Sequence, residues 1–251
     1  MSLENKIIIV TGASRGIGAA MAALFLKRGA TVIGSYASDA GMMKDLIDQY
    51  GAQRMAALQA EFSQPASAEI FFNTVKSKYP RIDGMVNNAG IMPETPITVS
   101  MDDWHHDWSQ TMQVNVQAVA DLCKMYVTDS LNNNTAAQIV NIASRAAYRG
   151  DGPDYWHYAA SKGAITALTK TIARAYARNN IHAYTIAPGW VRTDMASVAF
   201  EEGNEYMLDE IPLGRAAEPA EIAEIAAMLL SGACNSATGS VFDINGASHV
   251  R

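Results

Sequence analysis

Tyr158 and Lys162 are the residues whose types and spacing most directly indicate chemistry. They lie four positions apart in a stretch with helical periodicity, so both side chains occupy one face of a helix. A phenol normally ionises near pH ~10, which is too high for efficient proton exchange at neutral pH. Because a nearby ammonium favours the phenolate, we expect Lys162 to lower the pKa of Tyr158. The pair therefore predicts proton transfer to or from a substrate oxygen.

A glycine-rich turn, Thr11-Gly12-Ala13-Ser14-Arg15-Gly16-Ile17-Gly18, follows the first apolar run and leads directly into a helix. Gly12 permits a tight turn, Gly16 lets the backbone approach a pyrophosphate, and Gly18 allows close packing of helix on strand. The unpaired N–H groups and the positive dipole end of the helix favour an anion there. The turn therefore predicts a dinucleotide site. Its expected members are Gly12, Ser14, Arg15, Gly16, Ile17 and Gly18.

Short apolar, β-branched runs alternate with longer helical stretches along the whole chain of 251 residues. The expected strands cover 7–10, 31–33, 55–59, 83–86, 138–143, 181–187 and 240–244. The expected helices cover 15–28, 40–50, 65–78, 101–108, 111–128, 156–178 and 221–230. Uniformly apolar strands indicate a parallel sheet covered on both faces, and right-handed crossovers make it doubly wound. We therefore expect one α/β domain with a Rossmann fold over 1–251, with its ligands at the carboxyl ends of the strands.

Six motifs occur in a fixed order that is more specific than any one of them. They are the turn 11–18, Asn87-Asn88-Ala89-Gly90, Asn115, Ser144, Tyr158-x-x-x-Lys162 and Pro188-Gly189. In this the chain resembles the short-chain dehydrogenase/reductase family over nearly its full length, and 3-oxoacyl-(acyl-carrier-protein) reductases in particular. The resemblance implies that Tyr158 exchanges a proton, Ser144 holds the substrate oxygen, Lys162 contacts the nicotinamide ribose and Asn115 anchors a water relay to Lys162. Ser144 and Tyr158 are fourteen residues apart, about one more than in similar proteins, and 150–153 can absorb the extra residue.

The resemblance also assigns residues after the other strands to the nicotinamide cofactor. Glu61 and Phe62 are implied at the adenine, although the family more often has Asp or Asn in place of Glu61. The remaining implied contacts are Asn88, Ala89, Gly90, Tyr158, Lys162, Pro188, Gly189, Val191 and Thr193. When the cofactor is oxidised, its positive ring adds to the lowering of the Tyr158 pKa.

The end of the second strand favours NADP over NAD. An acid there would bond the ribose 2′-hydroxyl of NAD and repel a 2′-phosphate, but Gly34-Ser35-Tyr36-Ala37-Ser38 precedes the first acid, Asp39. Arg15 can reach a phosphate, and the hydroxyls of Ser35 and Ser38 can assist it. We therefore expect Ser35, Tyr36, Ala37 and Ser38 to line the cofactor site.

The substrate is the least defined part of the prediction. Residues 192–214 resemble the family's substrate lid, and Tyr148, Trp156, Trp190 and Met195 are candidate apolar wall residues. Arg145 and Arg149 flank Ser144 and are candidates for recognising an anionic substrate. Three functions stay open: reduction of a ketone or 3-oxoacyl group, a sugar, polyol or other small-alcohol dehydrogenase, and an NADP-sensing regulator without turnover. The complete catalytic set argues against the regulator, because sensing needs no proton donor.

Composition limits the partners. A net charge of −6 and a pI near 5.3 argue against nucleic acid, and no apolar run is long enough to cross a membrane. Two cysteines without close spacing are typical of a reduced, cytoplasmic protein. The adjacent His105 and His106 point apart on a helix, so we expect no metal site. The helix 156–178 is apolar nearly all round, which predicts burial against a second copy, and family members are often tetramers.

Overall fold

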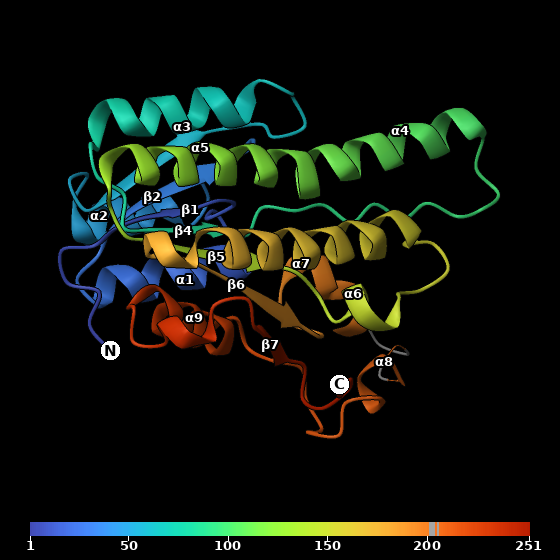
Figure 1. Ribbon diagram of the computed structural model, residues 1–251. Coiled ribbons are helices and arrows are strands. Elements are labelled where there is room, and N and C mark those ends of the chain that lie inside the picture. The colour runs from blue at the N-terminus through green and yellow to red at the C-terminus, as the bar shows by residue number, and fades with distance from the viewer. Residues whose placement is uncertain (201–203, 205) are drawn as a thin grey trace.

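The computed structural model describes residues 1–200, 204 and 206–251, without the side chain of Val198, and its centre is a seven-stranded sheet (Figure 1). All the strands are parallel, and their order is β3-β2-β1-β4-β5-β6-β7. The strands are β1 (Ile7–Val10), β2 (Thr31–Tyr36), β3 (Met55–Gln59), β4 (Gly84–Asn87), β5 (Ala137–Ile142), β6 (Ile181–Pro188) and β7 (Val241–Ile244). The order reverses direction at β1, which confirms the predicted doubly wound α/β fold.

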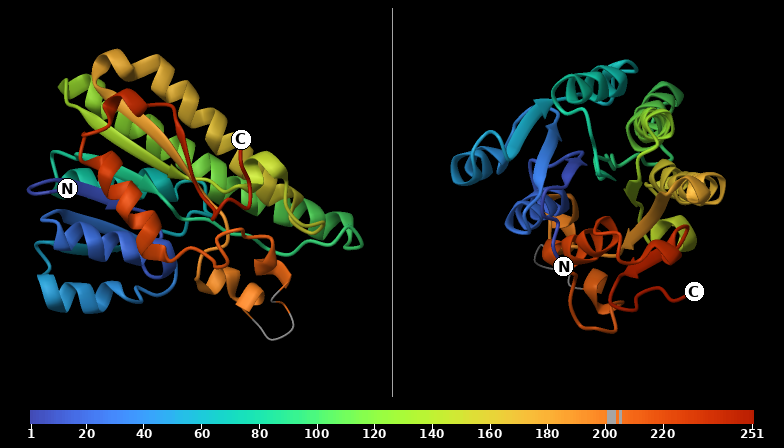
Figure 2. Two further views of the ribbon diagram at one scale, coloured as in Figure 1. Left: turned by 90° about the horizontal axis from the view of Figure 1, so that it is seen from below. Right: turned by 60° about the vertical axis from the view of Figure 1, so that its left-hand side comes forward.

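Helices cover both faces of the sheet (Figure 2). They are α1 (Gly16–Lys27), α2 (Met43–Tyr50), α3 (Ser67–Lys78), α4 (Met101–Met112), α5 (Ala118–Asn133), α6 (Ala146–Arg149), α7 (Trp156–Tyr176), α8 (Tyr206–Asp209) and α9 (Pro219–Leu230). Successive strand residues point to opposite faces. Ile8 therefore joins the apolar core under α1, α2 and α9, while Ile9 joins the core under α3, α5 and α7. The central strands contribute apolar residues to both faces because each face carries its own core.

The two helices expected at 101–108 and 111–128 form one continuous helical run. A π-helical turn, Gln113–Gln117, joins α4 to α5 and contains Asn115. The Asn115 side chain bonds both backbone groups of Ile91. Such turns are common where a functional side chain is held out of α-helical register. The run projects well beyond the sheet, as the two views of α4 in Figures 1 and 2 show.

The segment 192–214 leaves the sheet after β6 and returns before α9. It contains a 3₁₀ helix, Asp194–Phe200, and the short helix α8. Residues 201–203 and 205 of the predicted lid lie outside the described part of the chain. No helix in the described residues is long and apolar enough to span a membrane.

Candidate active site

One cavity of about 850 Å³ lies at the carboxyl ends of the strands, where the topology predicts a ligand. Its wall comes from the segments that follow β1, β2, β3, β4, β5 and β6. The predicted residues that line it are Gly12, Ser14, Arg15, Gly16, Ile17, Ser35, Tyr36, Ala37, Glu61, Phe62, Asn88, Ala89, Gly90, Ser144, Arg145, Tyr158, Lys162, Pro188, Gly189, Trp190, Val191, Thr193 and Met195. Arg149, a candidate for anion recognition, lines it as well. Five predicted residues do not line it: Gly18, Ser38, Asn115, Tyr148 and Trp156.

The glycine turn has the geometry that a dinucleotide requires. Gly12 and Gly16 have φ angles of +65° and +55°, in the left-handed region that favours glycine. A Cβ atom on Gly18 would lie 2.1 Å from the carbonyl oxygen of Gly12. Gly18 therefore stands behind the cavity and lets α1 pack on the turn. The backbone N–H groups of the turn and the start of α1 fit the pyrophosphate of a dinucleotide.

Ser35, near the end of β2, and Ser38, just after it, have different surroundings. Ser35 is buried, and its Oγ accepts a hydrogen bond from the Gly12 backbone N–H at 3.1 Å, so it holds the turn in place. Ser38 is exposed and lies outside the cavity wall, and its expected role at a 2′-phosphate stays a prediction. The Arg15 side chain is 77% exposed and lies 3.6 Å from Asp194. Arg15 is thus an accessible cation on the cavity wall.

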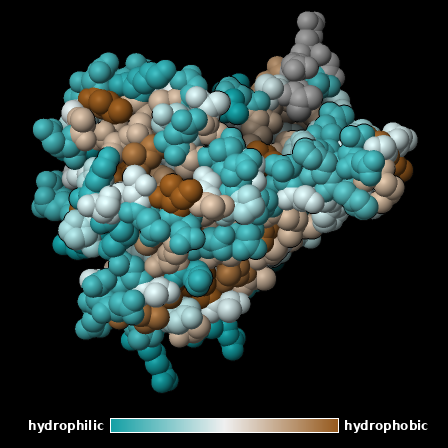
Figure 3. Space-filling view, turned by 90° about the horizontal axis from the view of Figure 1, so that it is seen from above, coloured by the Kyte–Doolittle hydropathy of each residue, from teal (hydrophilic) through white to brown (hydrophobic). Residues whose placement is uncertain are grey.

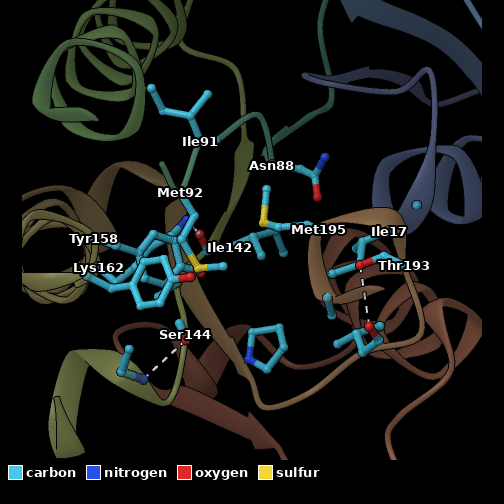
Figure 4. Close-up of a pocket in the computed structure, with 18 of the residues that line it drawn as sticks. Ile17, Asn88, Ile91, Met92, Ile142, Ser144, Tyr158, Lys162, Thr193 and Met195 are labelled. Atoms are coloured by element: carbon cyan, nitrogen blue, oxygen red, sulfur yellow. Dashed lines mark hydrogen bonds between the residues drawn. The ribbon is translucent and has the colours of Figure 1, made fainter. Parts of the chain in front are cut away.

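Tyr158, Lys162 and Ser144 meet inside the cavity (Figure 4). The first two lie one turn apart on α7, and Ser144 follows β5. Lys162 Nζ lies 5.5 Å from the centre of the Tyr158 ring and donates a hydrogen bond to the carbonyl oxygen of Ile142 at 3.0 Å. A Cβ atom on Gly90 would lie 3.5 Å from Lys162 Nζ, and glycine leaves this position empty. The loop after β4 can therefore approach the lysine closely.

Burial dominates the electrostatics of this pair. It raises the pKa of Tyr158 to about 12, the hydrogen bond with Ser144 opposes it, and the charge of Asp151 adds to it. Burial also lowers the pKa of Lys162 to about 8. The shift of the Tyr158 pKa comes from burial, Ser144 and Asp151, so the lowering expected from Lys162 and the oxidised cofactor stays a prediction. Burial favours the neutral form of Lys162 over the ammonium.

Asn115 acts from behind the cavity. Its Oδ1 accepts a hydrogen bond from the Ile91 N–H at 2.9 Å, and its Nδ2 donates to the Ile91 carbonyl at 2.9 Å and to Ser161 Oγ at 3.1 Å. It thus ties the π-helical turn to the loop after β4 and to α7. The water relay through Asn115 stays a prediction.

Two predicted wall residues lie elsewhere. The Tyr148 ring stacks on His249 at 6.2 Å, with the Arg251 guanidinium 4.0 Å above it. Trp156 is exposed and packs edge-on against Trp104 at 5.6 Å. Both predictions are wrong because neighbouring aromatic or cationic side chains hold these rings outside the cavity.

Recognition of an anion by Arg145 or Arg149 is also not supported. Arg145 is buried and bonds Glu210 and Ser248, and Arg149 lies 2.7 Å from the same carboxylate. Both guanidinium groups are thus engaged by one carboxylate, which offsets one of their two positive charges.

Several wall residues were not predicted. Met92 and Glu94 follow β4, and the placement rule for strand ends was a signal that could have found them. Met207 and Glu210 lie in the segment 192–214, which was expected to form a substrate lid, although neither residue was singled out. Among the described residues, no group of three His, Cys, Asp or Glu side chains is arranged to hold a metal ion.

A doubly wound sheet with a glycine turn and a Tyr–Lys pair in one cavity defines a dinucleotide-dependent oxidoreductase. A family model described as enoyl-(acyl carrier protein) reductase matches residues 12–249. The 3-oxoacyl-(acyl-carrier-protein) reductase of Vibrio harveyi is 33% identical over 246 residues, and that of Escherichia coli is 32% identical over 246, each match covering 98% of both chains. The chain belongs to the short-chain dehydrogenase/reductase family and is an NAD(P)-dependent enzyme.

Two solved structures are similar over the whole fold, each with a TM-score of 0.87 and 29% identity. One, from Agrobacterium tumefaciens, is provisionally assigned as a 2-deoxy-d-gluconate 3-dehydrogenase and contains NADP; the match covers 98% of this chain and 96% of that one. The other is a 3-ketoacyl-(acyl-carrier-protein) reductase from Brucella melitensis with NADH, covering 99% and 100%. These names differ in substrate and in cofactor, whereas the fold is common to all.

Proposed function

We propose that this enzyme interconverts a ketone or 3-oxoacyl group and a secondary alcohol, with Tyr158 as the general acid and base. The observation that carries the proposal is the position of Tyr158, buried in the cavity wall beside Ser144 and Lys162. Bound nicotinamide would supply or accept the hydride at the carbonyl carbon. In reduction, Tyr158 donates its phenolic proton to the carbonyl oxygen, and in oxidation it takes that proton back.

Each neighbour of Tyr158 has a distinct part in this scheme. The Ser144 hydroxyl, which hydrogen-bonds Tyr158, is positioned to hold the substrate oxygen at the same point. Lys162 has donors left beyond its bond to the Ile142 carbonyl, and these can reach a cofactor ribose and support the phenolate. Because burial raises the pKa of Tyr158 to about 12, the tyrosine is protonated at neutral pH. The protein alone thus favours the acid required for reduction.

A cofactor-dependent assay on a substrate panel tests this function. We expect nicotinamide absorbance to change with at least one ketone, acyl thioester or sugar, and ketones or 3-oxoacyl esters to give the highest kcat/KM. Turnover of sugars or polyols alone would favour the small-alcohol dehydrogenase. Tight cofactor binding with turnover of no compound would contradict an enzymatic role and favour an NADP-sensing regulator.

The preference for NADP follows from the charges near the end of β2. Arg15 is an exposed cation on the cavity wall. Asp39, the first acid after β2, lies outside that wall and pairs with Lys44 at 2.8 Å. No acid of the β2 end is thus left to select a ribose 2′-hydroxyl.

We expect the ratio of kcat/KM for NADPH to that for NADH to exceed one, and Arg15→Ala to lower it about tenfold, because a charge-assisted bond to phosphate is worth about 1.5–3 kcal/mol. Steady-state kinetics with both cofactors measure the ratio. Arg192→Ala is the matched control, since Arg192 pairs with Glu218 and does not line the cavity. A higher kcat/KM for NADH in the unaltered protein would contradict the preference.

We also propose that a second copy of the chain covers α7 and that the assembly is a tetramer. The outer face of α7 exposes Trp156, Ala160 and Ala167, which are apolar, next to Lys170 and Arg174. Small side chains allow a second helix to approach closely. Figure 3 shows the molecule from above relative to Figure 1. On that face, apolar side chains lie in small groups between polar ones.

A further inference from the structure

Two positively charged side chains at one end of the cavity share one carboxylate partner. This substrate end is the part of the wall formed by residues 144–146, 149–155, 206, 207 and 210, together with Glu94. Its two cations are Arg145 and Arg149, and both approach Glu210. Its other acids are Glu94, Asp151 and Asp154, and within the described residues none of them forms an ion pair.

Glu210 satisfies three donors from three elements. Its Oε1 accepts hydrogen bonds from Arg145, which follows β5, and from Trp190 Nε1 at 3.1 Å, which follows β6. Its Oε2 accepts from Arg149 at the end of α6 at 2.7 Å. The Arg145 guanidinium also faces the Trp190 ring at 5.7 Å. Glu210, which directly follows α8, therefore connects the end of that helix with the segment that carries Ser144.

Glu210 offsets one of the two positive charges of Arg145 and Arg149. The Arg145 side chain is 7% exposed, so its charge requires a partner inside the protein. The hydrogen bonds from Arg149 and Arg145 hold the pKa of Glu210 below its usual range, although burial works in the opposite direction. Glu210 is thus ionised at neutral pH. Asp151 acts on the reacting centre directly, because its charge raises the pKa of Tyr158.

We propose that Glu210 is a specificity determinant: its carboxylate engages both Arg145 and Arg149 and offsets one of their two positive charges, so that the enzyme selects against substrates with a negative charge near the reacting carbonyl. The inference rests on the proposed function. Together with the unpaired carboxylates of Glu94, Asp151 and Asp154, Glu210 gives this end of the cavity more acidic than basic side chains. A carboxylate or phosphate close to the reacting carbon is repelled there, whereas an uncharged carbonyl compound is not.

A matched pair of ketones tests this proposal. Acetoacetate and methyl acetoacetate share the reacting 3-oxo group and differ by one negative charge. We expect the wild-type enzyme to have a lower kcat/KM for acetoacetate. Glu210→Gln keeps the size of the side chain and an acceptor oxygen but removes the charge. It should raise the ratio of kcat/KM for acetoacetate to that for the ester about tenfold, since about 1.4 kcal/mol corresponds to tenfold.

Two further variants distinguish a loss of charge from a structural disturbance around Glu210. Arg149→Gln removes a cation from the same cluster and should shift the ratio in the opposite direction, about fivefold. Asp209→Asn removes an equal charge next to Glu210, outside the cavity wall, and should leave the ratio within about twofold. An unchanged ratio in both Glu210→Gln and Arg149→Gln, or an equal shift in Asp209→Asn, would overturn the proposal.

Equilibrium binding separates this inference from the proposed function. Calorimetric titration of the wild type and of Glu210→Gln with each compound, in the presence of NADP, compares affinities without turnover. Discrimination against acetoacetate that Glu210→Gln relieves, in a protein that reduces neither ketone, would support the inference and count against the proposed reaction. Equal affinities for the two compounds in both proteins would overturn the inference, whatever the turnover.

Discussion

At the scale of single residues, burial changes the pKa values of Tyr158 and Lys162 in opposite directions. The phenol becomes a weaker acid and the ammonium a stronger one, so both groups are biased toward their neutral forms. Tyr158 is therefore protonated at neutral pH, and a positive charge close to the phenolate is needed to lower its pKa. Burying the Lys162 ammonium lowers the free energy of unfolding.

This cost predicts how stability depends on pH without added cofactor. The pKa of Lys162 is about 8 in the folded chain and near 10.5 unfolded, so between these values the unfolded chain holds a proton that the folded chain has lost. Stability therefore rises with pH on account of Lys162, by about 2 kcal/mol between about pH 7.5 and about pH 9.5. Urea unfolding of the wild type and of Lys162→Met measures it. A stability difference between the two proteins that stays constant over this range would disprove the account.

At the scale of elements, the approach of α1 to the turn after β1 depends on Gly18. A Cβ atom there would lie 2.1 Å from the Gly12 carbonyl oxygen and 2.7 Å from Asn88 Nδ2. We expect Gly18→Ala to lower the free energy of unfolding by about 2 kcal/mol or more and to weaken cofactor binding, because backbone must move. Gly163→Ala, in α7, is the control: its Cβ atom would meet only the Ala147 carbonyl at 3.8 Å. Its stability should stay equal or rise, since alanine favours helix. Equal effects in denaturant unfolding would refute the argument.

The regular elements could be predicted from sequence because their cause is local. Apolar runs and helical periodicity placed strands such as Met55–Gln59 and Ile7–Val10 at their observed bounds. The π-helical turn at Asn115 could not be predicted, since it depends on bonds to Ile91, 24 residues away. The Glu210 cluster was missed for the same reason, because its partners lie 20 to 65 residues distant. Tyr148 and Trp156 were misplaced because their apolar rings suit either the cavity or an aromatic neighbour.

At the scale of the whole molecule, the carboxyl-end edge of the sheet carries the site, and the exposed side chains of α7 lie on the face of that helix turned away from the cavity. Every strand from β1 to β6 contributes a following segment to one cavity. Residues 193–196, 206, 207 and 210 complete the wall together with the residues after β5. Exposed apolar residues on α7 then stand apart from the chemistry and suit contact with another copy.

We expect the protein in solution to have about four times the 27.0 kDa mass of one chain. The physical reason is that an apolar helix face gains free energy on burial, at about 25 cal/mol per Å². Light scattering coupled to size exclusion measures the mass at micromolar concentration. Ala167→Arg, on the exposed face of α7, should lower it, whereas Thr128→Arg, on the exposed side of α5, serves as the comparison. A mass of about 27 kDa for the unaltered protein would contradict the proposal.

The central claim concerns the proton that Tyr158 carries. Tyr158→Phe removes only the phenolic oxygen and keeps the ring in the cavity wall. With the best ketone of the panel, we predict that kcat falls by about 10²–10⁴-fold while the Kd for NADPH stays within about threefold. Retention of normal turnover by Tyr158→Phe would contradict the account.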